Sequence, residues 1–245
     1  GCNFTSNTSN GLGGAGIFNY ASSIIVTDCL FSGNIEGNDP GNGAGLYNGA
    51  LSQAVITNCV FSGNYAGRNG GGLYNDGSTY TLTNCTFSGN YCATGGAIYN
   101  INSSSEPKIQ NTIIWGNHGS DFPEIYPAGT DASITFSDIL SLPGGTDGNI
   151  NADPLFVDRP DPSPFSFVGG DYNLKPGSPA LNAGNTALNA STVDIANSTR
   201  VVGTAIDMGA YEFQQTSLPV NLIIFNGSVQ DGNATMRWPT GYETD

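Results

Sequence analysis

The sequence has few basic residues, which excludes most ways of binding nucleic acid. Lys and Arg account for 6 of the 245 residues, against 20 Asp and Glu, so the formal net charge is −14. Binding to a phosphate backbone needs a stripe of Lys and Arg. We therefore expect no nucleic-acid partner, and we interpret the acidic surface as a solubilising one.

The sequence also lacks helical periodicity and long hydrophobic runs. No window places apolar residues at i, i+3, i+4 and i+7, and 35 Gly and 13 Pro disfavour helices further. No apolar run is long enough to span a bilayer, and the pattern of a signal peptide is missing. Zinc is not expected, because the one histidine, His118, has no Cys or His partner at ligand spacing.

What the sequence does contain is a repeat. One phrase occurs at Val26–Ser32, Ile56–Ser62 and Leu82–Ser88, and more loosely at Ile109–Trp115. The column of residues Cys2, Cys29, Cys59, Cys85 and Thr112 advances in steps of 27, 30, 26 and 27. A period of this length predicts a solenoid. The repeats are short runs of β-branched and aromatic residues bounded by Gly and Asn, so we predict an all-β parallel β-helix.

Each repeat can be divided into inward columns and corners. Counted from the Cys position, the apolar residues at −3 and +2 differ in parity, so the chain must bend between them. The residues at −1 are Asp28, Asn58, Asn84 and Asn111. Asn and Asp tolerate the left-handed conformation of a tight corner. We expect them to form a hydrogen-bonded ladder between coils about 4.8 Å apart.

Further columns follow from the same alignment. One column is amide, formed by Asn7, Asn34, Asn64, Asn90 and Asn117. Another is aromatic, formed by Phe18, Tyr47, Tyr74 and Tyr99, and we expect its rings to stack. The cysteines of the repeat share one inward column, so we expect them to be buried and reduced rather than paired.

The phrases Phe4–Asn7, Phe31–Asn34, Phe61–Asn64 and Phe87–Asn90 alternate with the Gly-rich phrases. In this alternation, residues 1–117 resemble the repeats of polymorphic outer membrane proteins. That resemblance implies a right-handed, single-stranded parallel β-helix on a bacterial surface.

Residues 118–213 resemble the C-terminal part of the choice-of-anchor Q group of bacterial β-helix proteins. The matching phrases are Ala152–Phe156, Leu174–Ala180 and Ile206–Glu212. We interpret this region as final coils and a cap over the end of the core. Within it we expect Arg200 to pair with Asp207 or Glu212.

Residues 214–245 no longer follow the repeat. The stretches 218–225 and 234–238 read as two alternating strands after a linker. They resemble the start of an Ig- or FnIII-like β-sandwich module found in secreted Bacteroidetes proteins that carry type IX secretion signals. The resemblance implies a secreted or cell-surface protein, and the repeat interrupted at residue 1 suggests a piece of a longer chain.

Residues suited to catalysis are scarce in the repeats. The bases there are Arg68 and Lys108, in different coils, and no pair of carboxylates is held at a fixed separation. We therefore predict no catalytic residues. The loop residues Glu36, Asp39 and Arg68 are the candidate ligand-binding residues.

Oxygen-bearing side chains alternate at Asp147, Asn149, Asn151 and Asp153, as at the start of a Ca²⁺ loop. The distal bidentate Glu is missing, and an ordinary turn into Asp-Pro explains the same residues. A Ca²⁺ site and a plain turn both remain open.

Three functions compete on these observations. The first is a non-catalytic, adhesin- or stalk-like module that presents loops to a glycan or a surface protein. The second is a polysaccharide lyase or glycoside hydrolase, which rests on the fold alone. The third is an ice or mineral binder, for which the single outward column of Thr27, Thr57 and Thr83 offers too narrow a face.

Overall fold

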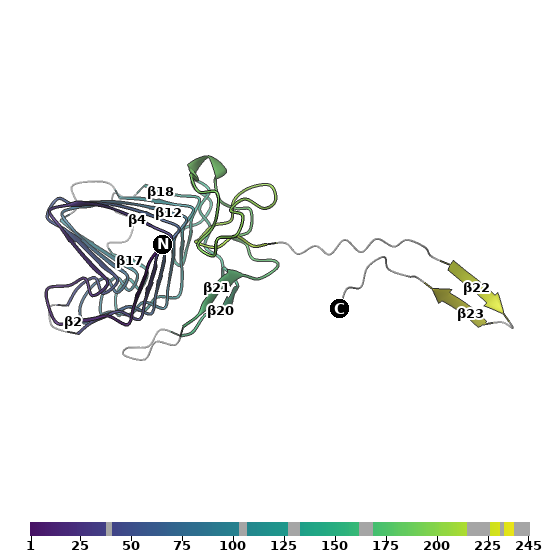
Figure 1. Ribbon diagram of the computed structural model, residues 1–245, viewed down its shortest axis with the longest axis horizontal. Coiled ribbons are helices and arrows are strands. Elements are labelled where there is room, and N and C mark those ends of the chain that lie inside the picture. The colour runs from purple at the N-terminus through teal and green to yellow at the C-terminus, as the bar shows by residue number, and fades with distance from the viewer. Residues whose placement is uncertain are drawn as a thin grey trace. The chain divides into compact units, whose positions relative to one another are not determined.

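The computed structural model describes residues 1–37, 41–102, 107–126, 133–161, 169–214, 226–230 and 233–237. The chain divides into two units, Gly1–Gln214 and Gln215–Asp245. In the first unit, successive coils stack behind one another as a parallel β-helix, with the first coil nearest the viewer in Figure 1.

Four parallel sheets form the walls of the coils, and we number them in the order in which the chain meets them. Sheet 1 contains β1 (Asn3–Thr5), β5 (Leu30–Ser32), β9 (Val60–Ser62), β13 (Thr86–Ser88), β16 (Ile113–Ile114) and β19 (Asp138–Ile139). Sheet 2 contains β2 (Thr8–Ser9), β6 (Ile35–Glu36) and β10 (Tyr65–Ala66). Sheet 3 contains β3 (Ile17–Tyr20), β7 (Leu46–Gly49), β11 (Leu73–Asp76), β14 (Ile98–Ile101) and β17 (Ile125–Tyr126). Sheet 4 contains β4 (Ser23–Thr27), β8 (Gln53–Thr57), β12 (Thr79–Thr83), β15 (Lys108–Gln110) and β18 (Ser133–Thr135).

The predicted inward columns are confirmed. Phe31 pairs in register with Phe4 and Phe61, and Phe61 with Phe87. The rings of Phe31, Phe61 and Phe87 are fully buried and stack with centroids 4.4 Å apart. Each coil therefore buries its apolar side chains against the equivalent residues of its neighbours, which is how a repeat too small to fold alone becomes stable.

The predicted corner ladder is confirmed as well. Asp28, Asn58, Asn84 and Asn111 all have φ between 49° and 55°. The Asn58 amide donates to Asp28 at 3.1 Å, and the Asn84 amide donates to Asn58 at 3.1 Å. The amide of Asn111 continues the ladder to Asn84 at 3.2 Å.

The second amide column forms a buried ladder with one direction. Each Nδ2 from Asn7 to Asn90 donates to the Oδ1 of the next coil's Asn at 2.8 Å. The last Nδ2, of Asn117, donates to Glu124 Oε2 at 2.6 Å. The ladder therefore ends on a carboxyl group, whose oxygens accept the hydrogen bonds that the last Asn donates.

The cysteines are free, as expected. Cys29, Cys59 and Cys85 are buried in their column, whereas Cys2 is exposed in the first coil. Cys92, outside the column, is buried against Ala44 and Ala66. Burial raises the pKa of the Cys85 thiol to about 12, which makes it a poor nucleophile.

The coils continue past residue 117. Ile134 pairs with Ile109 and Ile139 pairs with Ile114, as the predicted alignment requires. A shorter turn then brings Ile150 beside Asp138. Leu142 packs against the core of the β-helix, so the turn that follows the last coil contributes to closing it.

The segment after residue 155 does not lie where the sequence predicted a cap. It contains the antiparallel pair β20 (Phe156–Asp158) and β21 (Asp171–Leu174) and the 3-10 turn η1 (Thr186–Leu188). Its residues Phe156, Tyr172, Leu174 and Met208 pack on Val60 and Ile113, which point outward from sheet 1. It therefore covers the side of the β-helix, because sheet 1 has an apolar outer face that needs a partner.

We call the described residues 156–161 and 169–212 the lateral segment. The corner ladder of the coils holds it in place as well. Asn58 donates to the carbonyl oxygen of Val193 at 3.0 Å, Asn84 donates to Asn189 Oδ1 at 2.8 Å, and Asn111 donates to the carbonyl oxygen of Asn185 at 3.1 Å.

Arg200 is fully buried in the lateral segment. Its Nη1 lies 4.0 Å from Glu212 Oε2, at the outer limit of an ion pair and beyond hydrogen-bond reach, so the expected pairing with Glu212 is ionic and not hydrogen-bonded. Its Nη2 donates to the carbonyl oxygens of Gly209 at 2.6 Å and Asp207 at 3.3 Å. Arg200 thus holds the loop 207–212 together through backbone carbonyls and one carboxylate.

The second unit is described over one antiparallel hairpin, β22 (Asn226–Gln230) with β23 (Asn233–Arg237). The latter overlaps the predicted strand 234–238. The predicted strand 218–225 lies outside the described residues, and β22 follows it. A hairpin alone is marginal in water. The β-sandwich stays a prediction, because the other residues of this unit lie outside the described ranges.

Candidate functional site

The outer face of sheet 3 carries the predicted aromatic column. Along each strand Leu or Ile points inward, the next residue points outward, and the following Asn points inward again. The outward rings stack from coil to coil at centroid distances of 4.8, 5.1, 5.4 and 4.6 Å. These rings belong to Phe18, Tyr47, Tyr74, Tyr99 and Tyr126. We call this set the aromatic column.

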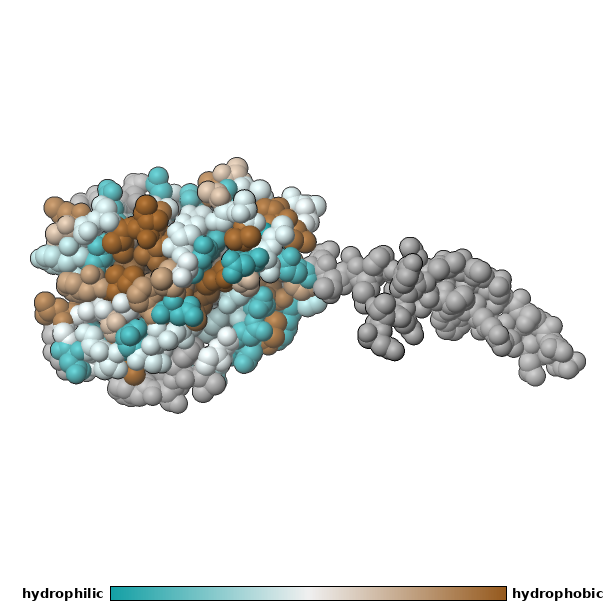
Figure 2. Space-filling model, in the orientation of Figure 1, coloured by the Kyte–Doolittle hydropathy of each residue, from teal (hydrophilic) through white to brown (hydrophobic). Residues whose placement is uncertain are grey.

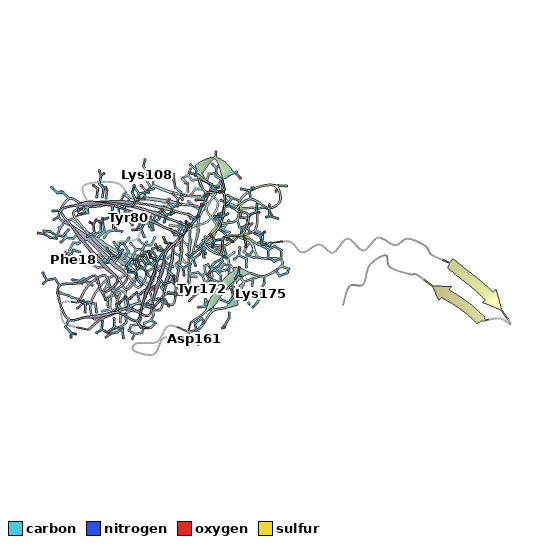
Figure 3. The ribbon with its side chains drawn as sticks, viewed as in Figure 1. Phe18, Tyr80, Lys108, Asp161, Tyr172 and Lys175 are labelled. Carbon is cyan, nitrogen blue, oxygen red and sulfur yellow. The ribbon has the colours of Figure 1, made fainter. Side chains whose placement is uncertain are left out.

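Figure 3 shows Phe18 on the outside of the coil and Tyr80 on the inside. Phe18 is 45% exposed, whereas Tyr74 is 8% exposed, so the rings are accessible at the first coil and largely covered in the middle coils. The faces of the inner rings are occupied by their neighbours. A ligand would therefore meet the ring edges and the hydroxyl groups, which repeat once per coil.

The backbone under the aromatic column is held rigidly. On the inner side of the strands, the Asn19 amide donates to Asn48 at 2.7 Å, and the Asn48 amide donates to Asn75 at 2.9 Å. On the approach to β7, Gly43 has a φ of 63°, and a Cβ there would lie 2.9 Å from the Cβ of Tyr74. The glycine is required both by the corner and by the close approach of the ring.

Charged groups flank the aromatic column on both sides. Asp76 follows Tyr74 by two residues on the same outer face and accepts a hydrogen bond from Asn102 at 3.0 Å. Burial and, secondarily, Asp76 raise the pKa of Tyr74 to about 12, while Arg68 opposes the shift. Arg68 also lowers the pKa of Tyr99 against the larger effect of burial. The hydroxyls of Tyr47, Tyr74 and Tyr99 therefore stay protonated and can donate hydrogen bonds.

A second stack was missed by the sequence reasoning. Tyr65 stacks on Tyr91 with centroids 5.7 Å apart, and Tyr91 stacks on His118 at 4.4 Å. These residues directly follow Asn64, Asn90 and Asn117 in the amide ladder. That position, one after each ladder Asn, was the signal that could have found the stack.

The structure separates the predicted ligand-binding residues. Arg68 is exposed, beside the aromatic column. Glu36 is 0% exposed, and neither of its carboxylate oxygens has a hydrogen-bond partner. Asp39 lies outside the described residues. Of the three, Arg68 is therefore the described residue that a ligand on this face could reach.

The four residues of the predicted Ca²⁺ loop are spread over different contacts. Asn149 is buried, where its Oδ1 accepts from the Ser137 N–H at 3.0 Å and its amide donates to the Ile134 carbonyl at 2.8 Å. Asn151 Oδ1 accepts from Ser141, and Asp153 Oδ1 accepts from Leu155. Asp147 is exposed with a φ of 53°. Three of the four side chains thus accept hydrogen bonds from backbone N–H groups.

Two of the strongly perturbed carboxyl groups belong to the scaffold. Burial raises the pKa of Glu124 to about 8, although Asn117 and the Gly116 N–H donate to its oxygens. Burial likewise raises the pKa of Glu212 to about 7. Neither group faces the aromatic column, and among the residues that the structure describes no three His, Cys, Asp or Glu gather as a metal cluster.

The comparisons with known proteins agree with this architecture. A family model described as the right-handed beta helix region matches residues 1–126, slightly more than half of the chain. No curated protein and no solved structure matches the chain. A search of the described residues for a helix long and apolar enough to cross a membrane found none.

Proposed function

The chain belongs to the family of right-handed β-helix regions, and from that premise we propose that it is a non-catalytic binding module of a secreted or cell-surface protein. The module presents the aromatic column, with Arg68 beside it, to an extended polysaccharide or to a surface protein. Membership of the fold leaves binding and catalysis equally open, so the proposal rests on the site.

The repeat of the aromatic column is the observation that carries the proposal. Its ring edges and hydroxyls recur along the β-helix axis at a nearly constant spacing, with rings 4.6 to 5.4 Å apart. A polymer with a repeating unit can make the same contact at each coil, and contacts that are weak singly add up along its length. A polysaccharide laid along the axis of sheet 3 therefore fits this face better than a compact ligand does.

The absence of paired groups on this face argues for binding without turnover. Among the described residues beside the column, Arg68 and Asp76 are the charged groups that act on its hydroxyls. A lyase needs a base for the proton and a cation for the resulting charge, and a hydrolase needs two carboxylates across the scissile bond. Asp76 alone does not make the pair of carboxylates that a hydrolase needs. Arg68 is the cation that a lyase would use, and the turnover assays with Arg68→Ala test that arrangement.

The experiment pairs a glycan array with turnover assays on the same polysaccharides. Tyr99→Phe removes one hydroxyl and keeps the ring in the stack, whereas Tyr99→Ala removes the ring as well. We expect binding to weaken several-fold with the first variant and more with the second. Thr81→Ala, outward on sheet 4, is the matched control and should leave binding unchanged.

The alternative, a polysaccharide-active enzyme, is decided by the second half of the experiment. Uronate polymers would be assayed for unsaturated products and neutral glycans for new reducing ends. Sustained turnover that Arg68→Ala, Lys108→Ala or Glu36→Gln abolishes would replace the binding module with an enzyme. If the chain captured a protein but no glycan, it would still be a binding module, but its partner would be a surface protein.

A further inference from the structure

Sheet 1 carries an unexpected acid on its outer face. The outward residues of its strands are Leu30, Val60, Thr86 and Ile113 in successive coils, and Asp138 takes this place in β19. Leu30, Val60 and Ile113 are apolar, and the hydroxyl oxygen of Thr86 accepts a hydrogen bond from the Ala210 N–H at 2.9 Å. Asp138 is 0% exposed, because the turn 149–153 passes beside it.

One oxygen of Asp138 lacks a partner. Oδ1 accepts from the Ala152 N–H at 3.1 Å, whereas Oδ2 has no hydrogen bond. A buried carboxylate oxygen without a donor is costly, and native proteins usually satisfy such an atom with a donor, a water or an ion. The carboxylate is held by the residue that directly precedes Asp153, so a second carboxylate lies within the same turn.

The two carboxylates act on each other without a described counter-charge. Burial and the charge of Asp153 raise the pKa of Asp138 to about 7, against the effect of the Ala152 N–H. Among the described residues the ion pair within 4.0 Å is that of Arg200 with Glu212, at another place in the lateral segment. Asp153 itself is exposed, and its Oδ1 accepts a hydrogen bond from the Leu155 N–H at 2.9 Å.

We propose that Asp138 and Asp153 together bind a divalent cation of the Ca²⁺ type, between β19 and the turn that leads into the lateral segment. Carboxylate oxygens suit Ca²⁺, which accepts irregular sets of six to eight oxygens, including backbone carbonyls and water. Zn²⁺ prefers nitrogen and sulfur ligands, and Mg²⁺ demands a stricter octahedron. Two carboxylates predict weak binding, with a dissociation constant on the order of 10⁻⁴–10⁻³ M.

The site differs from the loop that the sequence indicated. Asp138 precedes that loop by nine residues and reaches it only because the last coil folds back on itself, whereas Asn149 is turned inward to serve Ser137. A cation held here would tie the last coil to the start of the lateral segment. Binding should therefore stabilise the folded chain.

The test is thermal unfolding of the chain in EDTA, CaCl₂ and MgCl₂ at matched ionic strength. At a Ca²⁺ concentration ten times the dissociation constant, we expect the midpoint to rise by about 3–6 °C. Asp153→Asn, at an exposed position that should not disturb folding, should abolish the rise, and so should Asp138→Asn. Asp28→Asn is the matched control, because it removes one charge at a corner that holds Asn in three other coils.

Terbium luminescence gives a second measurement, since Trp115 belongs to the apolar cluster beside the site and can sensitise a bound ion. We expect luminescence that Ca²⁺ displaces and that Asp153→Asn removes. An unchanged midpoint at roughly 10 mM Ca²⁺, well above the expected dissociation constant, would refute the proposal. So would loss of the response in Asp147→Asn together with its survival in Asp138→Asn, which would place the ion in the loop instead.

Discussion

The coils of residues 1–126 and the lateral segment reach a buried core by different means. In the coils, each side chain packs on its own equivalent one coil away, as Phe31, Phe61 and Phe87 do. In the lateral segment no residue repeats, and the packing depends on single contacts such as those of Arg200 and Met208. A repeat spreads its stability over many similar contacts, whereas an irregular segment concentrates it in a few.

Two expected effects are equally large, and the first is in the lateral segment. Arg200→Met should lower the free energy of unfolding by about 3–5 kcal/mol, because it leaves Glu212 buried without its cation and two carbonyls without a donor. Urea denaturation would measure the loss. Hydrogen exchange should show faster exchange in residues 194–212 than in the coils, and equal acceleration in both would contradict the localised contact.

A comparable change in the coils tests the repeating core. Phe61→Ala opens a cavity between two stacked rings and should cost about 3–5 kcal/mol. Thr57→Ala, at an outward position of sheet 4, should cost less than about 0.5 kcal/mol. Similar costs for the two variants would mean that the assignment of inward and outward columns is wrong.

The end of the amide ladder predicts a pH dependence. The pKa of Glu124 is raised to about 8 in the folded protein, so its contribution to stability is full below its unfolded pKa of about 4.3. That contribution is lost as the pH rises through the folded pKa, by up to about 1.4 kcal/mol per pH unit. Glu124→Gln should flatten this slope between pH 5 and 8, although it removes one acceptor from the ladder. A slope identical to that of the wild type would contradict the assignment.

The smallest of the four effects lies where the two regions meet. Thr86 Oγ1 accepts the Ala210 N–H at 2.9 Å, and Thr86 is 1% exposed. Thr86→Val keeps the shape and leaves that N–H unsatisfied, so it should cost about 1–3 kcal/mol. Thr81→Val, on the outer face of sheet 4, is the matched control. A neutral Thr86→Val would mean that the lateral segment docks through its apolar contacts alone.

As with the fold, the sequence predicted the repeating part of the candidate site and did not predict the rest. The aromatic column followed from the spacing of Phe18, Tyr47, Tyr74 and Tyr99, because stacking neighbours are one period apart. Its flanking charges did not, since Arg68 was grouped with Glu36 as a loop residue, and the Glu36 side chain is buried. Alternation along a two-residue strand such as β6 is too short to indicate which residue faces inward.

The solenoid, the register of its coils and the roles of its Asn, Phe and Cys columns could all be predicted from the sequence. This was possible because each of these contacts joins residues one period apart, so that spacing along the chain becomes position in space. The tertiary structure alone decided where the lateral segment lies, what ends the amide ladder and which carboxylates meet. Those contacts join residues such as Thr86 and Ala210, or Asp138 and Ala152, whose separations match no period and are settled by the surfaces that the finished coils leave open.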